Sequence, residues 1–165
     1  MIKLISKLTA AIAVASIALL GSANAKTLKI ETHFTASSPN GEVAAQFAKN
    51  VEMFSGGSLK VEMFYSSSVT GKSAEVFNSA QTGIIDCDMT GAGYQTGKNA
   101  AFQFAGDVMG GYDNPYQQYD FLKFPGAQDA VDALYNKYGM TLIGWWIPGH
   151  ESLISSKPIP DVASI

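Results

Sequence analysis

The sequence predicts an exported protein of the α/β class, with one parallel sheet. Apolar segments typical of strands alternate with helical segments in the order strand, helix, strand, helix, strand between residues 28 and 90. This order and spacing favour parallel pairing with right-handed crossovers. The 140 residues that follow an N-terminal export signal suit a single domain.

Residues 1–25 have the pattern of a cleavable signal peptide. Two lysines precede an uncharged apolar run over residues 8–20, and Ala23 and Ala25 supply the small residues that signal peptidase accepts. Cleavage is therefore expected before Lys26. The apolar run is too short for a comfortable membrane span, so we expect a soluble protein in the periplasm rather than a membrane anchor.

The composition of residues 26–165 excludes some functions. Nine lysines and fourteen acidic residues give a net charge of −5, which argues against nucleic-acid binding. Cys87 is the only cysteine, so no intrachain disulfide can form and stability must come from a packed core. The chain has no arginine, the usual clamp for a carboxylate. If the protein binds a small anion, that clamp is missing or lies outside this chain.

The first half of the domain begins with a strand and a helix. Residues 28–33 alternate in polarity and predict the first strand. Ser38 and Pro39 provide a cap and a first turn for a helix whose apolar stripe runs from Val43 to Phe54. The glycine pair at 56–57 ends this helix.

A second strand and a second crossover follow. Residues 59–65 alternate again and predict a strand. Residues 73–81 predict a short helix that stops at Gly83. Residues 84–90 predict the third strand.

The second half is less regular. A glycine-rich loop covers residues 91–97, and the glycine-broken apolar segment 102–111 has no assigned structure. Helices are expected over residues 115–123 and 128–138. The strongly apolar segment 140–147 predicts a fourth strand.

The glycine-rich loop does not have the spacing of a dinucleotide-binding loop, and it follows the third strand rather than the first. A plain turn at the carboxyl edge of the sheet is favoured. Ligands of open α/β sheets bind at that edge, so Tyr94 and Gln95 are candidate site residues.

Asp86 and Asp88 alternate along the third predicted strand. They could form a metal site or an acid/base pair. The favoured alternative places Ile85 and Cys87 in the core and leaves the two acids capping or solvated. Cys87 lacks the surroundings of a nucleophile and is expected to act as a small buried hydrophobe.

The ends of the first and fourth predicted strands should lie at the same edge of a parallel sheet. His33 and His150 occupy these ends, where they could join a metal site or an acid/base pair, bind a ligand through hydrogen bonds, or have a structural role. Trp145 and Trp146 should point to opposite faces, one toward the core and one toward a cleft. Glu151 is a candidate metal ligand, hydrogen-bond acceptor or surface charge.

An ordered set of segments resembles one protein family. They are Leu28-Lys29-Ile30, Ser38-Pro39, Ser55 to Glu62, Gln81 to Asp86, Tyr94 to Lys98, Gly144-Trp145-Trp146 and Ser155 to Ile159. The set is similar to the DctP-like solute-binding proteins of tripartite ATP-independent periplasmic (TRAP) transporters. The Gly-Tyr-Gln-Thr-Gly-Lys stretch ending at Lys98 is most like the branch that binds 2-oxo acids and related monocarboxylates.

The resemblance implies a periplasmic-binding-protein-like fold of two α/β lobes. Residues 26–150 would form the N-terminal lobe, and residues 151–165 would begin the crossing into a second lobe that this fragment lacks. The expected function is capture of a 2-oxo acid, another monocarboxylate or a C4-dicarboxylate for import, without enzymatic activity. TRAP permease subunits are the implied partners, with a homodimer of the full-length protein as a further possibility.

The resemblance and the strand order together give the candidate site. The expected substrate-binding residues are His33, Tyr94, Gln95, Trp146, His150 and Glu151. No organic cofactor is expected, although a sodium or calcium ion could accompany the substrate, with Glu151 as its ligand. The segment around Glu151 departs from the glutamine-containing pattern of the oxo-acid branch.

Two other classes of function remain as alternatives. An exported hydrolase or oxidoreductase would need a catalytic motif, and the sequence has neither Gly-x-Ser-x-Gly nor a proper dinucleotide loop. An exported adhesion or scaffold module would present an exposed apolar patch in place of a cleft.

Overall fold

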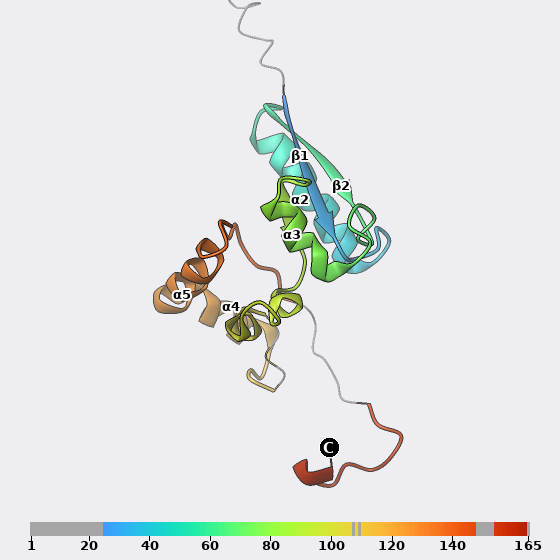
Figure 1. The fold of residues 1–165 in the computed structure, drawn as a ribbon, viewed down its shortest axis with the longest axis vertical. Helices are drawn as coiled ribbons and strands as arrows, with labels where there is room; N and C mark the ends of the chain where they lie inside the picture. The colour runs from blue at the N-terminus through green and yellow to red at the C-terminus, as the bar shows by residue number, and fades with distance from the viewer. Residues whose placement is uncertain (1–24, 107, 109, 148–153, 165) are drawn as a thin grey trace, which may run out of the picture.

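The core of the fold is a three-stranded parallel sheet. The computed structural model describes residues 25–106, 108, 110–147 and 154–164. Strands β1 (Lys26–Thr32), β2 (Leu59–Phe64) and β3 (Cys87–Met89) lie in the order β2-β1-β3, as Figure 1 shows in part. Both neighbours run parallel to β1, which confirms the predicted parallel α/β class.

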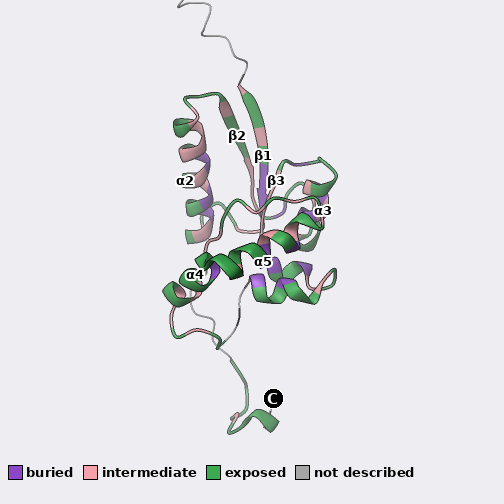
Figure 2. Cartoon of the chain, turned by 90° about the vertical axis from the view of Figure 1, so that its left-hand side faces the viewer, coloured by how far each residue is buried: buried purple, intermediate pink, exposed green. Residues whose placement is uncertain are grey.

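Two helices cover the sheet. Helix α2 (Pro39–Phe54) connects β1 to β2, and helix α3 (Val76–Gln81), preceded by a short 3-10 turn, connects β2 to β3. The first crossover leads from β1 to its neighbour β2, and the second leads back across β1 to β3, so right-handed connections place the two helices on opposite faces of the sheet. Figure 2 shows the strands between α2 and α3.

Helix α2 begins where the sequence predicts. The Ser38 Oγ accepts a hydrogen bond of 3.1 Å from the Gly41 N–H, and Pro39 occupies the first turn. The buried face consists of Gly41, Ala44 and Ala48. These small residues let the helix lie close to the sheet. The predicted apolar face of the helix is wrong at its two ends, because Val43 and Phe54 are exposed.

Strand β3 is shorter than the predicted segment 84–90. The backbone N–H groups of Ile84 and Ile85 both donate to the Ser79 carbonyl, at 2.9 and 3.4 Å. These residues thus complete the C-terminal turns of α3 instead of pairing with β1. Gly83 has a φ of +75° within this turn, a conformation that favours glycine.

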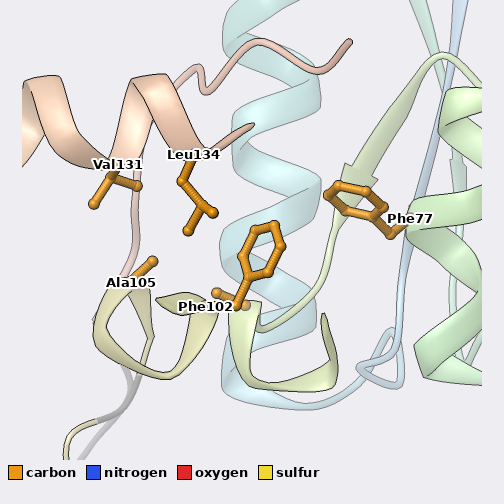
Figure 3. Packing of buried hydrophobic residues seen from close by; sticks show 6 residues of the cluster. Phe77, Phe102, Ala105, Val131 and Leu134 are labelled. Atoms are coloured by element: carbon orange, nitrogen blue, oxygen red, sulfur yellow. The ribbon is translucent and has the colours of Figure 1, made fainter. Parts of the chain in front are cut away.

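Helices α4 (Pro115–Lys123) and α5 (Pro125–Asn136) form a second group of elements beside the sheet (Figure 1). Helix α4 has the predicted bounds, with Asn114 as its cap. Helix α5 starts three residues earlier than predicted. Figure 3 shows Val131 and Leu134 of α5 directed toward Phe102 and Ala105 of the 3-10 segment Ala100–Ala105, with Phe77 of α3 completing the cluster.

The predicted fourth strand over residues 140–147 is wrong: this segment has no strand pairing. Met140, Leu142 and Trp145 instead pack their side chains against the Phe77–Phe102 cluster. Burial of these apolar side chains holds the segment in place without backbone pairing. Within the part of the chain that the structure describes, no helix has the length and apolar character to cross a membrane.

Candidate ligand cavity

An open cavity of about 1110 Å³ lies where the sheet ends and the segment 140–147 passes. Its walls come from the end of β1, from β3 and the loop after it, from helices α2, α4 and α5, and from residues 139–147. The carboxyl ends of β1 and β3 meet here because the strands are parallel, and this is the edge at which open α/β sheets bind ligands.

One wall of the cavity is aromatic. The His33 ring lies 3.9 Å from the Phe34 ring and 5.3 Å from the Tyr94 ring, centroid to centroid. The Phe34 ring lies 5.3 Å from that of Trp146. Three segments far apart in the sequence thus meet, and three predicted site residues, His33, Tyr94 and Trp146, lie on one surface.

The adjacent tryptophans diverge as predicted. Trp145 packs against the Phe77–Phe102 cluster, whereas Trp146 contacts Phe34. Both also line the cavity, so this wall combines an apolar surface with the indole N–H of Trp145.

Four residues of the cavity lining each have one side-chain polar atom that is buried without a hydrogen-bond partner in the described chain. These atoms are His33 Nδ1, Asp88 Oδ1, Thr90 Oγ1 and Trp145 Nε1. An unpaired buried polar group costs about 1–3 kcal/mol, and such groups in native proteins require an explanation. All four residues belong to the cavity lining, so this wall is polar as well as aromatic.

The electrostatics of this wall centre on Asp88. Burial raises the pKa of its carboxyl to about 6, the negative charge of Glu31 adds to the rise, and Thr90 offsets part of it. Burial and the charge of Asp88 likewise raise the pKa of Tyr135 to about 12. Burial lowers the pKa of His33, which favours its neutral form at pH 7.

Asp86, just before β3, and Cys87, on β3, have the surroundings of residues with a structural role rather than a catalytic one. The exposed carboxylate of Asp86 accepts a hydrogen bond of 2.8 Å from the Lys29 N–H, which agrees with the favoured capping alternative. Ile85 is buried as expected, and Cys87 is half-buried. Burial, with the charges of Asp86 and Asp88, raises the pKa of the Cys87 thiol, the opposite of what a nucleophile needs.

Gln95 does not join the other predicted site residues. It is only 2% exposed, and its side-chain amide donates to the Ala74 carbonyl at 3.3 Å. The 3-10 turn Ala92–Gln95 directs it into the protein, whereas Tyr94 remains 46% exposed. His150 and Glu151 lie outside the described residues. Among those that are described, no group of three His, Cys, Asp or Glu side chains could hold a metal ion.

Four residues of the cavity lining are missing from the predicted site. Phe34 directly follows His33 and Thr90 directly follows β3, and their place at the sheet edge was the available signal. Asp88 was considered only as a metal ligand, an acid/base group or a solvated acid. Trp145 was assigned to either the core or the cleft, and it contacts both.

Comparison with known proteins identifies the family. Residues 30–165 match the model of the bacterial extracellular solute-binding protein family 7, DctP. A comparison with curated proteins gives no match. Among solved structures, a TRAP periplasmic solute-binding protein from Rhodobacter sphaeroides in an open apo state is similar, with 26% identity and a TM-score of 0.66 over 72% of this chain and 37% of that one.

Two further structures with lower identity share the fold. One, from Pseudoalteromonas atlantica with bound sodium and pyruvate, has 19% identity and a TM-score of 0.64, covering 70% of this chain and 35% of that one. The other, DctP6 of Bordetella pertussis, binds pyroglutamic acid and has 21% identity and a TM-score of 0.60, covering 72% and 38%.

The matched part of the chain therefore spans little more than a third of the length of these structures. They are periplasmic solute-binding receptors rather than enzymes, in agreement with the sequence expectation. The family match covers most of the chain, and the parallel α/β lobe with its cavity at the sheet edge accords with it. This chain belongs to the DctP family of bacterial extracellular solute-binding proteins, the receptors of TRAP transporters.

Proposed function

We propose that this chain forms the N-terminal lobe of a periplasmic receptor that captures a small organic acid and delivers it to TRAP permease subunits. The observation that carries the proposal is the cavity at the sheet edge, whose aromatic wall and polar lining residues suit a small polar ligand. The similar structures include receptors with bound pyruvate and pyroglutamic acid, which supports a small carboxylate as the ligand.

The proposed organisation follows from the sequence. Residues 1–25 act as a signal peptide, residues 26–150 form the lobe, and residues 151–165 begin the crossing to a second lobe. The length of the similar structures, about twice this chain, supports a second lobe. That lobe would close over the cavity in a hinge motion and would supply the cationic clamp for the ligand carboxylate, because this chain has no arginine.

A cation is a further part of the proposal. The relatives from Pseudoalteromonas atlantica and Colwellia psychrerythraea hold sodium or calcium together with pyruvate. We assign Glu151, next to His150 in the sequence, as the candidate ligand of such an ion. A homodimer is also proposed, supported by a related calcium- and picolinate-binding receptor that forms a dimer.

A thermal-shift screen tests the function directly. The protein is expressed from its complete reading frame, including any continuation beyond Ile165, and is screened against small carboxylates and sugars. Carboxylates should raise the melting temperature in proportion to the logarithm of their concentration, because they bind only the folded state. Stabilisation by sugars without any by carboxylates would contradict the proposed function.

A further inference from the structure

The aromatic wall of the cavity begins just beyond the paired part of β1. The pairing of β1 with β2 ends at Glu31, and its pairing with β3 ends at Thr32. His33 and Phe34 follow directly, so strand pairing does not fix the backbone of these two residues. Another set of hydrogen bonds must hold their rings in the cavity wall.

Those hydrogen bonds come from the loop of residues 66–71, which follows β2. The Ser66 N–H donates to the Phe34 carbonyl oxygen at 3.0 Å. The Ser67 N–H donates to the Thr32 carbonyl oxygen at 3.1 Å. The two bonds hold the backbone on either side of the histidine, so the position of the aromatic wall depends on the position of this loop.

The loop has a backbone conformation that needs support from its surroundings. Ser66 and Ser67 both lie in the left-handed region, with φ values of +58° and +52°. This region is unfavourable for residues other than glycine, and such residues persist there only where the surrounding structure fixes them. The loop therefore requires contacts from outside itself to keep its shape.

The carboxylate of Glu31 supplies such a contact. This residue is fully buried, and its Oε1 accepts the Val69 N–H at 2.6 Å and the Thr70 N–H at 3.4 Å. Its Oε2 has no hydrogen-bond partner within the described residues. A buried carboxylate is costly, and an apolar side chain of similar size would pack at least as well. What Glu31 contributes is therefore its attachment to the loop.

We propose that Glu31 is a positioning residue of the receptor, which holds the loop of residues 66–71 and thereby sets the place of His33 and Phe34 in the cavity wall. Glu31 is absent from the cavity lining, so it acts through the loop and the backbone rather than by touching the ligand. The inference rests on the proposed function, because it takes this wall as the surface that meets the ligand.

The test separates the hydrogen bonds of Glu31 from its bulk, in the protein expressed from its complete reading frame. Glu31→Gln keeps an oxygen that can accept from the loop, whereas Glu31→Met fills similar space without a strong acceptor. Glu31→Asp keeps the carboxylate but is one methylene shorter, so it gives a second way to release the loop if Glu31→Met does not fold.

The first measurement needs no ligand. The NMR signals of the His33 ring, identified by their loss in His33→Gln, report its contact with the Phe34 ring at 3.9 Å. They should shift toward the values of an unstructured histidine in Glu31→Met and Glu31→Asp. In Glu31→Gln they should stay close to those of the parent protein.

The second measurement is affinity, by isothermal titration calorimetry, for pyruvate and pyroglutamic acid, the acids bound by two of the similar structures. Glu31→Met should bind at least about tenfold more weakly than the parent protein, and Glu31→Gln should stay within about threefold, because a binding site needs its walls held closely in place. The matched control is Ala130→Gly, at an exposed position of α5. It lowers the stability of the helix and should change neither measurement.

Unchanged His33 signals in Glu31→Met and Glu31→Asp would overturn the inference. Equal shifts in Glu31→Gln or in Ala130→Gly would also overturn it, because lost charge or lost stability would then account for them. So would shifted signals with unchanged affinity, because the wall would then not matter for binding. Failure of both acids to bind the parent protein, with the expected shifts in the His33 signals, would instead count against the proposed function and leave the positioning of the wall by Glu31 intact.

Discussion

Asp88 should destabilise the folded protein at neutral pH when the cavity is empty. Burial raises the pKa of this carboxyl from 3.8 to about 6, whereas the unfolded chain keeps the ordinary value. The folded state therefore binds the proton more tightly, and stability falls as pH rises through the window between the two values. A difference of about two pKa units corresponds to about 3 kcal/mol once the group is ionised in both states.

Replacing this residue removes that cost. Asp88→Asn has nearly the same volume and no ionised form, so it should increase the free energy of unfolding by up to about 3 kcal/mol above pH 6. The gain should shrink steadily below pH 6 and nearly vanish near pH 3.8, where Asp88 is mostly protonated. Urea unfolding of both proteins at pH 7.5, 5 and 4, followed by circular dichroism, measures the difference.

Asp129→Asn, on an exposed helix position, serves as the control and should change stability by less than about 0.5 kcal/mol. A variant at Asp88 that is no more stable than the parent protein at pH 7.5 would refute the reasoning, as would a gain that does not depend on pH. The first result would mean that Asp88 has a favourable partner in solution. The second would mean that packing, rather than charge, limits stability at this position.

Other predictions test the helix packing and the aromatic wall. Gly41→Ala should cost about 1–3 kcal/mol in urea unfolding, because an added Cβ would lie 2.0 Å from the Thr35 carbonyl oxygen. Gly126→Ala, whose Cβ would meet nothing nearer than 4.0 Å, should instead stabilise by about 0.4–1 kcal/mol; similar losses in both variants would contradict this packing argument. Tyr94→Phe should weaken ligand binding by about 0.5–1.5 kcal/mol if the exposed hydroxyl bonds the ligand, and unchanged affinity in calorimetry would remove that hydroxyl from the site.

Local signals in the sequence predicted the helices, and the succession of the first three strands along the chain, well. The Ser38 cap with Pro39, and the helix from Pro115 to Lys123, are specified by residues that lie next to each other in the chain. The segment 140–147 was misassigned because a strongly apolar run reports burial and not backbone pairing. Met140, Leu142 and Trp145 are indeed half-buried, but they pack on an aromatic cluster instead of joining the sheet.

From the sequence, the site could be predicted only as a position at the carboxyl edge of the sheet, without the direction of each side chain. Parallel topology brings His33 and Tyr94 together, and the sequence order was enough to infer that. Trp146 reaches the same surface from a segment outside the sheet, so its predicted place was right although the strand predicted to put it there does not form. The direction of a side chain within a 3-10 turn was not predictable, and this direction is why Tyr94 lines the cavity and Gln95 does not. The role of Asp88 depends on which residues surround it in space, above all Glu31 and Tyr135, and no local pattern carries that information.

The most direct test of the account is a crystal structure of the protein from its complete reading frame, bound to the acid that gives the largest thermal shift. We expect the ligand to lie in the cavity at the sheet edge, against His33, Tyr94 and Trp146. A ligand bound elsewhere, with this cavity filled by protein side chains, would contradict the assignment of the site.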